Sequence, residues 1–269
     1  MSIEWTANSI GILIESAKLL RTHATWCEEE SMAALPEEIT RAPLRTFRTQ
    51  ALAHRYTQPA VQLHRLRKQG RVRRAARGLH YAVPEGAAAS WRPSLEALAA
   101  GVATALYGER VPVLMHLSAA RLHGATPRAL ARAVVAVPGQ HPALALEDRE
   151  DAQVLFVKRD TDALDAQSMS TDLGPVLVTG PEQTLLDLAR RPDLLDLPGE
   201  VSEAVRGLWP RCDEELLEHL AEGQRGRSAL RRARRVRQGA HFDPEPRAAV
   251  HGDVRGALSG DLVRTGGCA

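Results

Sequence analysis

The residues best suited to chemistry are eleven positively charged side chains in residues 41–84, a segment that contains no aspartate or glutamate. The flanking sequence has the opposite sign, because residues 1–40 and residues 85–269 are both net negative. Like charges at this density repel one another, and such a segment is typical of proteins that bind a polyanion, although a solvated basic face without a ligand is the alternative. The eleven residues are Arg41, Arg45, Arg48, Arg55, Arg65, Arg67, Lys68, Arg71, Arg73, Arg74 and Arg77.

The order of residues in this basic segment predicts the elements that present the charges. Short helices are expected over residues 35–44 and 48–56. A longer helix is expected over residues 59–69, because Thr57 is a suitable N-cap, Pro59 fits the first turn and Gly70 fits the C-terminal end. Two runs of β-forming residues around a Gly-containing turn follow, over residues 71–84, and predict a hairpin.

Helix, turn, helix and hairpin in this order predict a winged helix, whose second helix enters the major groove of DNA. At 100° per residue, one side of the 59–69 helix carries Ala60, Leu63 and Leu66 and is expected to face the core. The opposite side carries Gln58, Val61, Gln62, Arg65 and Lys68.

We expect one set of these residues to contact base edges and another to contact phosphates. Glutamine and arginine form bidentate pairs with adenine and guanine, which assigns Gln58, Gln62 and Arg65 to the base edges. Hairpin arginines release counterions from the phosphates. The phosphate set is Lys68, Arg71, Arg73, Arg74 and Arg77, and Thr57 and His80 complete the predicted DNA-binding residues.

The rest of the chain predicts a second domain of mixed type. Strands are expected over residues 111–116, 132–138, 153–158 and 176–179, and helices over residues 90–107, 117–124, 181–190, 200–208, 213–222 and 227–238. The predicted fold class is therefore α+β, an N-terminal winged helix-turn-helix followed by a mixed α/β domain that ends in a helical segment. The predicted divisions are an N-terminal extension (1–33, with Met1 and Met32 both candidate start residues), the winged helix (34–86), the α/β domain (87–239) and a flexible tail (240–269).

A second arginine-rich segment, residues 225–237, forms a basic helix with Arg227, Arg231, Arg234 and Arg235 as a possible secondary basic surface. It either extends the DNA footprint, contacts an RNA or a partner protein, or is a solvated terminal helix.

Catalytic and metal sites have little support in the sequence. Asp160 and Asp162 are the basis of an alternative function, a metal-dependent nuclease or nucleotidyltransferase, but a polar loop explains them better. His116 and His123 are interpreted as core or capping histidines, and no catalytic residue, metal ligand or cofactor is predicted. A third hypothesis is a protein-interaction module without DNA binding.

Three segments resemble the AbiEi-type antitoxins, transcriptional regulators of abortive-infection operons. They are residues 66–81 of the basic segment, residues 117–124 (LSAARLHG) with the following strand, and residues 178–188 (VTGPEQTLLDL). The resemblance spans residues 34–238. It implies an N-terminal domain that binds operator DNA and represses transcription, in a type IV toxin–antitoxin system that gives phage defence. It also implies a C-terminal domain that counteracts a nucleotidyltransferase-type toxin without necessarily forming a stable complex.

Composition limits the location. No stretch of about 18 consecutive apolar residues is present, so no membrane span is predicted. The first residues lack the basic n-region of a secretory signal, and the three cysteines are widely spaced. We therefore expect a cytoplasmic protein.

Overall fold

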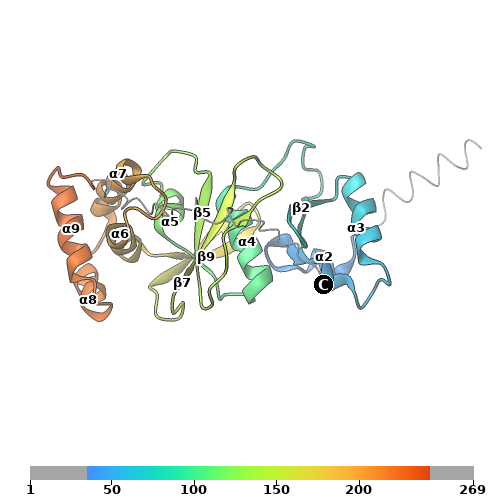
Figure 1. Cartoon of the computed structure of the whole chain (residues 1–269), viewed down its shortest axis with the longest axis horizontal. Helices are drawn as coiled ribbons and strands as arrows, with labels where there is room; N and C mark the ends of the chain where they lie inside the picture. Colours follow the sequence, from blue (N-terminus) through green and yellow to red (C-terminus); the bar gives the residue numbers. More distant parts are fainter. Residues whose placement is uncertain (1–34, 243–269) are drawn as a thin grey trace, which may run out of the picture.

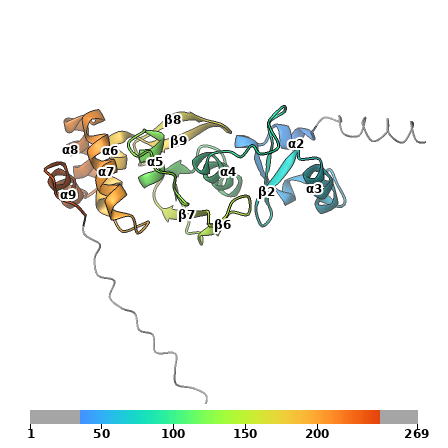
Figure 2. The same cartoon turned by 90° about the horizontal axis from the view of Figure 1, so that it is seen from above.

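The computed structural model describes residues 35–242, which form an elongated molecule with a small sheet at one end, a larger sheet in the middle and helices at the other end (Figures 1 and 2). The expected N-terminal extension and all but the first three residues of the expected tail lie outside the described residues. The elements up to residue 82 are α2 (Glu37–Thr40), η1 (Pro43–Arg45), β1 (Thr46–Arg48), η2 (Thr49–Leu52), α3 (Pro59–Lys68), β2 (Val72–Ala76) and β3 (Leu79–Ala82). The following elements are α4 (Leu95–Tyr107), β4 (Val113–Leu114), α5 (His116–Leu122), β5 (Arg132–Val137), β6 (Leu144–Ala145), β7 (Gln153–Lys158), β8 (Ala166–Thr171), β9 (Gly174–Thr179), α6 (Pro181–Arg190), α7 (Pro198–Leu208), η3 (Trp209–Arg211), α8 (Glu214–Gly223) and α9 (Arg227–Arg237).

Helix α3 begins and ends almost where the sequence predicts. Pro59 occupies its first turn, and Gly70, at a φ of +71°, takes the left-handed conformation that ends the helix. Leu63 and Leu66 face the core as expected, whereas Ala60 is exposed, so that part of the prediction is wrong. The predicted N-cap is also wrong, because Gln58 holds that position and makes no capping hydrogen bond with its side chain.

The small sheet has the order β1-β3-β2, with all strands antiparallel. Strand β1 was not expected, and the helix expected over residues 48–56 is reduced to the single turn η2. One face of the sheet, with Phe47, Val72 and Ala82, packs against α3. Side chains alternate along a strand, so Ala75 and Tyr81 point the other way, into the core built around α4. The hairpin thus has a core on each of its faces, and the domain division at residue 86 stays a prediction.

The larger sheet has the order β6-β7-β5-β4-β9-β8, with parallel β4–β9 and β5–β7 pairs and antiparallel neighbours elsewhere. Its central strands are short apolar runs, and alternate residues face opposite cores. Val135 and Val178 point toward α4, while Val134 and Leu177 point toward the C-terminal helices. Helix α4 is apolar nearly all round and is buried over residues 95–103, because it lies between the two sheets.

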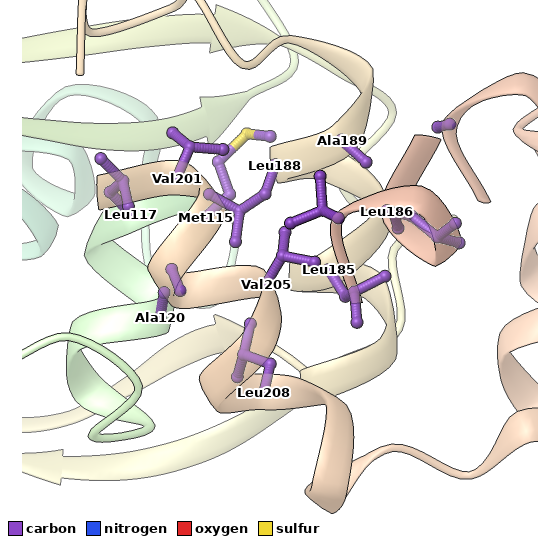
Figure 3. Close-up of a cluster of buried hydrophobic side chains, with 14 of the residues drawn as sticks. Met115, Leu117, Ala120, Leu185, Leu186, Leu188, Ala189, Val201, Val205 and Leu208 are labelled. Atoms are coloured by element: carbon purple, nitrogen blue, oxygen red, sulfur yellow. The ribbon is translucent and has the colours of Figure 1, made fainter. Parts of the chain in front are cut away.

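The C-terminal helices pack their apolar faces into one core with the larger sheet (Figure 3). Leu117 of α5, Leu185 and Leu188 of α6, and Val205 and Leu208 of α7 are fully buried there. The α+β class with a helical segment at the C-terminal end is therefore confirmed.

Gly101 on α4 lies close to strand β1. A Cβ added at Gly101 would overlap Thr46 Oγ1, which donates a hydrogen bond to the Leu44 carbonyl. We expect Gly101→Ala to lower the free energy of unfolding by about 1–2 kcal/mol, because overpacking outweighs the gain in helix propensity. Gly199→Ala is the matched control, since its Cβ would enter open space, and it should be neutral or slightly stabilising in denaturant unfolding. Equal effects of the two variants would contradict the close approach.

Candidate nucleic-acid interface

The exposed side of α3 carries Val61, His64, Arg65 and Lys68, spaced by three and four residues so that they form one stripe. The side chains of Arg65 and Lys68 have no ion-pair or hydrogen-bond partner within the described residues. Val61 is 48% exposed, which is unusual among the large apolar side chains of this part of the chain. Val61 was expected only as a residue of this face and His64 was not predicted, although the helical period that selects residues 61, 65 and 68 also includes residue 64.

The predicted base-contacting residues are not equivalent. Thr57 and Gln58 are exposed at the N-terminal end of α3, and Arg65 is exposed on the stripe. Gln62 is half-buried, and it lines a cavity of about 420 Å³ between α2 and α3 that Tyr56 and the exposed Arg65 also line. The structure therefore places Gln62 at the side of the exposed stripe.

The predicted phosphate-contacting arginines of the hairpin also differ in exposure and in partners, because of their positions in the strands. Arg77 is exposed at the turn between β2 and β3. Arg74 forms an ion pair with Glu147, with Nε and Oε2 3.2 Å apart. Arg73 points to the opposite face and donates a hydrogen bond to the Ala89 carbonyl, because neighbouring side chains in a strand alternate. Arg71 is half-buried and also has an interaction partner.

His80 was predicted to bind DNA, but it lies inside the protein. It is 4% exposed, its ring stacks on Phe47, and its Nε2 is 3.0 Å from Thr49 Oγ1. Burial, assisted by the nearby Arg67 and Arg74, lowers the pKa of His80 to about 4, so the ring is neutral near pH 7. This correction follows from the pairing of β3 between β1 and β2, which leaves His80 no path to the surface.

Acidic groups from elsewhere in the chain neutralise part of the basic segment. Glu37 pairs with Arg41 at 2.6 Å and Glu38 pairs with Arg55 at 3.4 Å. Within the basic segment, residues 41–84, the exposed side chains that have no partner among residues 35–242 lie on β1 with its preceding turn, on α3 and at the hairpin turn. They are Arg45, Arg48, Arg65, Lys68 and Arg77.

The second basic segment, helix α9, lies at the opposite end of the molecule from α3 (Figures 1 and 2). Arg227, Arg234 and Arg237 pair with the glutamates of α8 at 2.5–2.8 Å. Of the four residues predicted as a secondary basic surface, only Arg231 and Arg235 remain without a partner in the described part of the chain. The three ion pairs between α8 and α9 are Arg227–Glu222, Arg234–Glu218 and Arg237–Glu214.

The candidate catalytic groups do not assemble. Asp160 and Asp162 are exposed, and among residues 35–242 no three histidine, cysteine or acidic side chains are placed to hold a metal ion. His116 and His123 are buried, and their Nε2 atoms lie 3.0 Å and 2.7 Å from the carbonyls of Arg191 and Thr179. Their interpretation as core histidines is confirmed.

Residues 112–237, from β4 to α9, match the model of the AbiEi antitoxin C-terminal domain. The match identifies this part of the chain as an antitoxin domain. The match supports the AbiEi-type antitoxin family, a regulatory family, for the part of the chain that it covers.

The crystal structure of the RV2827C protein from Mycobacterium tuberculosis is similar at 19% sequence identity and a TM-score of 0.48, covering 80% of this chain and 86% of that chain. No curated protein matches the chain. None of the helices within residues 35–242 has the length and apolar character needed to cross a membrane.

Proposed function

We propose that the chain is a DNA-binding transcriptional repressor as well as an antitoxin, with residues 34–86 forming a winged helix on operator DNA. The order α2-β1-η2-α3-β2-β3 and the sheet order β1-β3-β2 support this proposal, because α3 then takes the place of the recognition helix and the β2–β3 hairpin that of the wing. The observation that carries it is the exposed stripe of α3, where Arg65 and Lys68 have no partner in the described part of the protein.

The positions of the side chains refine the predicted contacts. We infer that Gln58 and Arg65 contact base edges, and that Lys68 and Arg77 contact phosphates. We add His64 to the DNA-contacting residues and expect Gln62 to contribute little. Arg73 and Arg74 are not expected to contact DNA, because they bind the Ala89 carbonyl and Glu147. The C-terminal domain then counteracts the toxin, and the resemblance to AbiEi-type antitoxins implies a type IV system with a nucleotidyltransferase-type toxin.

The test is a salt titration of binding to a duplex taken from upstream of the chain's own gene. We expect Arg65→Ala/Lys68→Ala/Arg77→Ala to reduce the slope of log K against log salt by about 0.9 for each lost phosphate contact. The same variant should still relieve toxicity when it is produced with the cognate toxin, because the antitoxin domain is unaltered.

The matched control removes three exposed arginines at the other end of the molecule, as Arg225→Ala/Arg231→Ala/Arg235→Ala. It should leave the salt slope unchanged. A slope that falls equally in both triple variants would show attraction by overall charge, and an unchanged slope in the α3 variant would exclude α3 as the interface.

Val61 gives a second prediction about the same interface. An exposed valine beside Arg65 is suited to contact the 5-methyl group of thymine in the major groove. Replacing the contacted thymine with deoxyuridine removes one methyl group, worth about 0.8 kcal/mol, so the wild-type affinity should fall about fourfold. In Val61→Ser the same replacement should have no effect. If wild-type binding is insensitive to deoxyuridine at every thymine of the duplex, this contact does not exist.

A further inference from the structure

A cavity of about 600 Å³ lies where helices α6 and α9 end, and we call it the α6–α9 cavity. Its volume is in the range of small-molecule sites. It is lined by Arg190, Pro192, Asp193, Arg232, Arg235, Val236, Ala240, His241 and Phe242.

The lining of the α6–α9 cavity carries more positive than negative charge. Arg232 donates to the carbonyls of Ala189 and Arg190, with distances of 2.8 and 3.3 Å, and Arg190 donates to the Gln224 carbonyl at 3.1 Å. These acceptors are uncharged, so they orient the guanidinium groups without neutralising them. Burial, then the nearby Arg159, lowers the pKa of Arg190, as expected for arginines held close together.

Arg235 completes the basic lining and is free to bind. It is exposed and has no partner among residues 35–242, whereas Arg234 next to it is paired with Glu218. The arginines of α9 that pair with α8 thus lie on the opposite side of the helix from Arg235, and the side with Arg235 faces the cavity. Asp193 is the single carboxylate in the lining.

Apart from His241, the remaining walls of the cavity are apolar. Pro192, Val236 and Phe242 contribute to them. A site with guanidinium groups on one part and apolar groups on another is suited to a ligand that has an anionic and a flat apolar portion. Inorganic phosphate would use only the first of these.

We propose that the α6–α9 cavity binds a nucleotide, with its phosphates on Arg190, Arg232 and Arg235 and its base against the apolar walls. This site goes beyond operator binding, because α9 and α3 lie at opposite ends of the molecule (Figure 1). It lies at the edge of the antitoxin domain, where a bound nucleotide would be in contact with α6.

The test is isothermal titration calorimetry on the full chain at physiological ionic strength, in EDTA so that no metal ion bridges the partners. The probes are ATP, inorganic pyrophosphate, adenosine and a short 5′-phosphorylated RNA. We expect saturable ATP binding that is at least tenfold tighter than pyrophosphate binding, and no binding of adenosine.

Two charge reversals on α9 distinguish binding in the cavity from attraction of ATP by the overall positive charge of the helix. Arg235→Glu should weaken ATP binding at least tenfold, whereas Arg231→Glu, an exposed arginine outside the lining, should change it less than threefold. Both variants should unfold at the wild-type temperature and bind operator DNA as the wild type does.

Several outcomes would overturn the proposal. They are no saturable ATP binding, equal weakening by the two charge reversals, pyrophosphate binding as tight as ATP binding, or binding of the RNA without binding of ATP. None of these outcomes affects the salt titration that tests operator binding, so failure here leaves the proposed repressor function standing.

Discussion

Replacing Asp187 with alanine is expected to lower the free energy of unfolding by about 3–5 kcal/mol. Asp187 lies on α6 in the antitoxin domain and is 2% exposed. Its Oδ1 accepts a hydrogen bond from Arg159 Nη1 at 2.8 Å. The alanine variant would leave the guanidinium of Arg159 largely buried without its carboxylate, and the cost of an uncompensated charge exceeds that of a lost neutral hydrogen bond.

Denaturant unfolding measures this effect, with Asp162→Ala as the control. Asp162 is an exposed carboxylate without a partner in the described part of the chain, and its loss should change stability by less than about 0.5 kcal/mol. The double replacement Arg159→Met/Asp187→Leu should recover much of the loss, because apolar residues of similar volume often replace a buried ion pair at little cost. A loss below about 1 kcal/mol in the alanine variant would mean that the ion pair contributes little.

The second large effect is a loss of stability on acidification through His116. Burial lowers the pKa of His116 from its ordinary value of 6.5 to about 4. The unfolded chain therefore takes up the proton first as the pH falls, and the stability that is fully present above pH 6.5 is lost as the pH approaches 4. Each pH unit in this window costs about 1.4 kcal/mol, so about 2 kcal/mol should be lost between pH 6.5 and 5.

The variant His116→Asn isolates this contribution. The backbone at residue 116 has a φ of +58°, which asparagine tolerates better than most residues, and asparagine does not titrate. We expect the stability difference between wild type and variant to shrink by about 2 kcal/mol from pH 6.5 to pH 5, measured by urea unfolding at each pH. A difference that stays constant with pH would mean that His116 is protonated equally in both states.

Much of the antitoxin domain could be predicted from local sequence. The strand over residues 153–158 and the helix over residues 181–190 have the predicted bounds, because a short β-branched run and an amphipathic pattern that opens with a proline are strong local signals. Strand β8 was missed, since its sequence AQSMST is polar and it forms an edge strand whose partner β9 supplies the pairing. Strand β1 was missed for a similar reason, because only its pairing with β3 defines its three residues.

For the candidate interface, too, some features could be predicted from local sequence and others could not. Arg65 and Lys68 could be predicted to face outward, because both lie opposite Leu63 and Leu66 on one helix. The partner of Arg74 could not be predicted, since Glu147 is more than seventy residues away in sequence. Glu147 reaches β2 only through the packing of the chain, where its backbone N–H donates a hydrogen bond to the Ala75 carbonyl at 2.8 Å.

The sequence alone determined that the basic charges are concentrated in one segment, which elements carry them, and that the chain resembles AbiEi-type antitoxins. Only the tertiary structure decided which of those charges remain available to a ligand, because carboxylates from distant segments neutralise some and strand alternation turns others inward. Charge density is a local property of the chain. Its neutralisation depends on which distant groups come within about 4 Å, and that is a property of the fold.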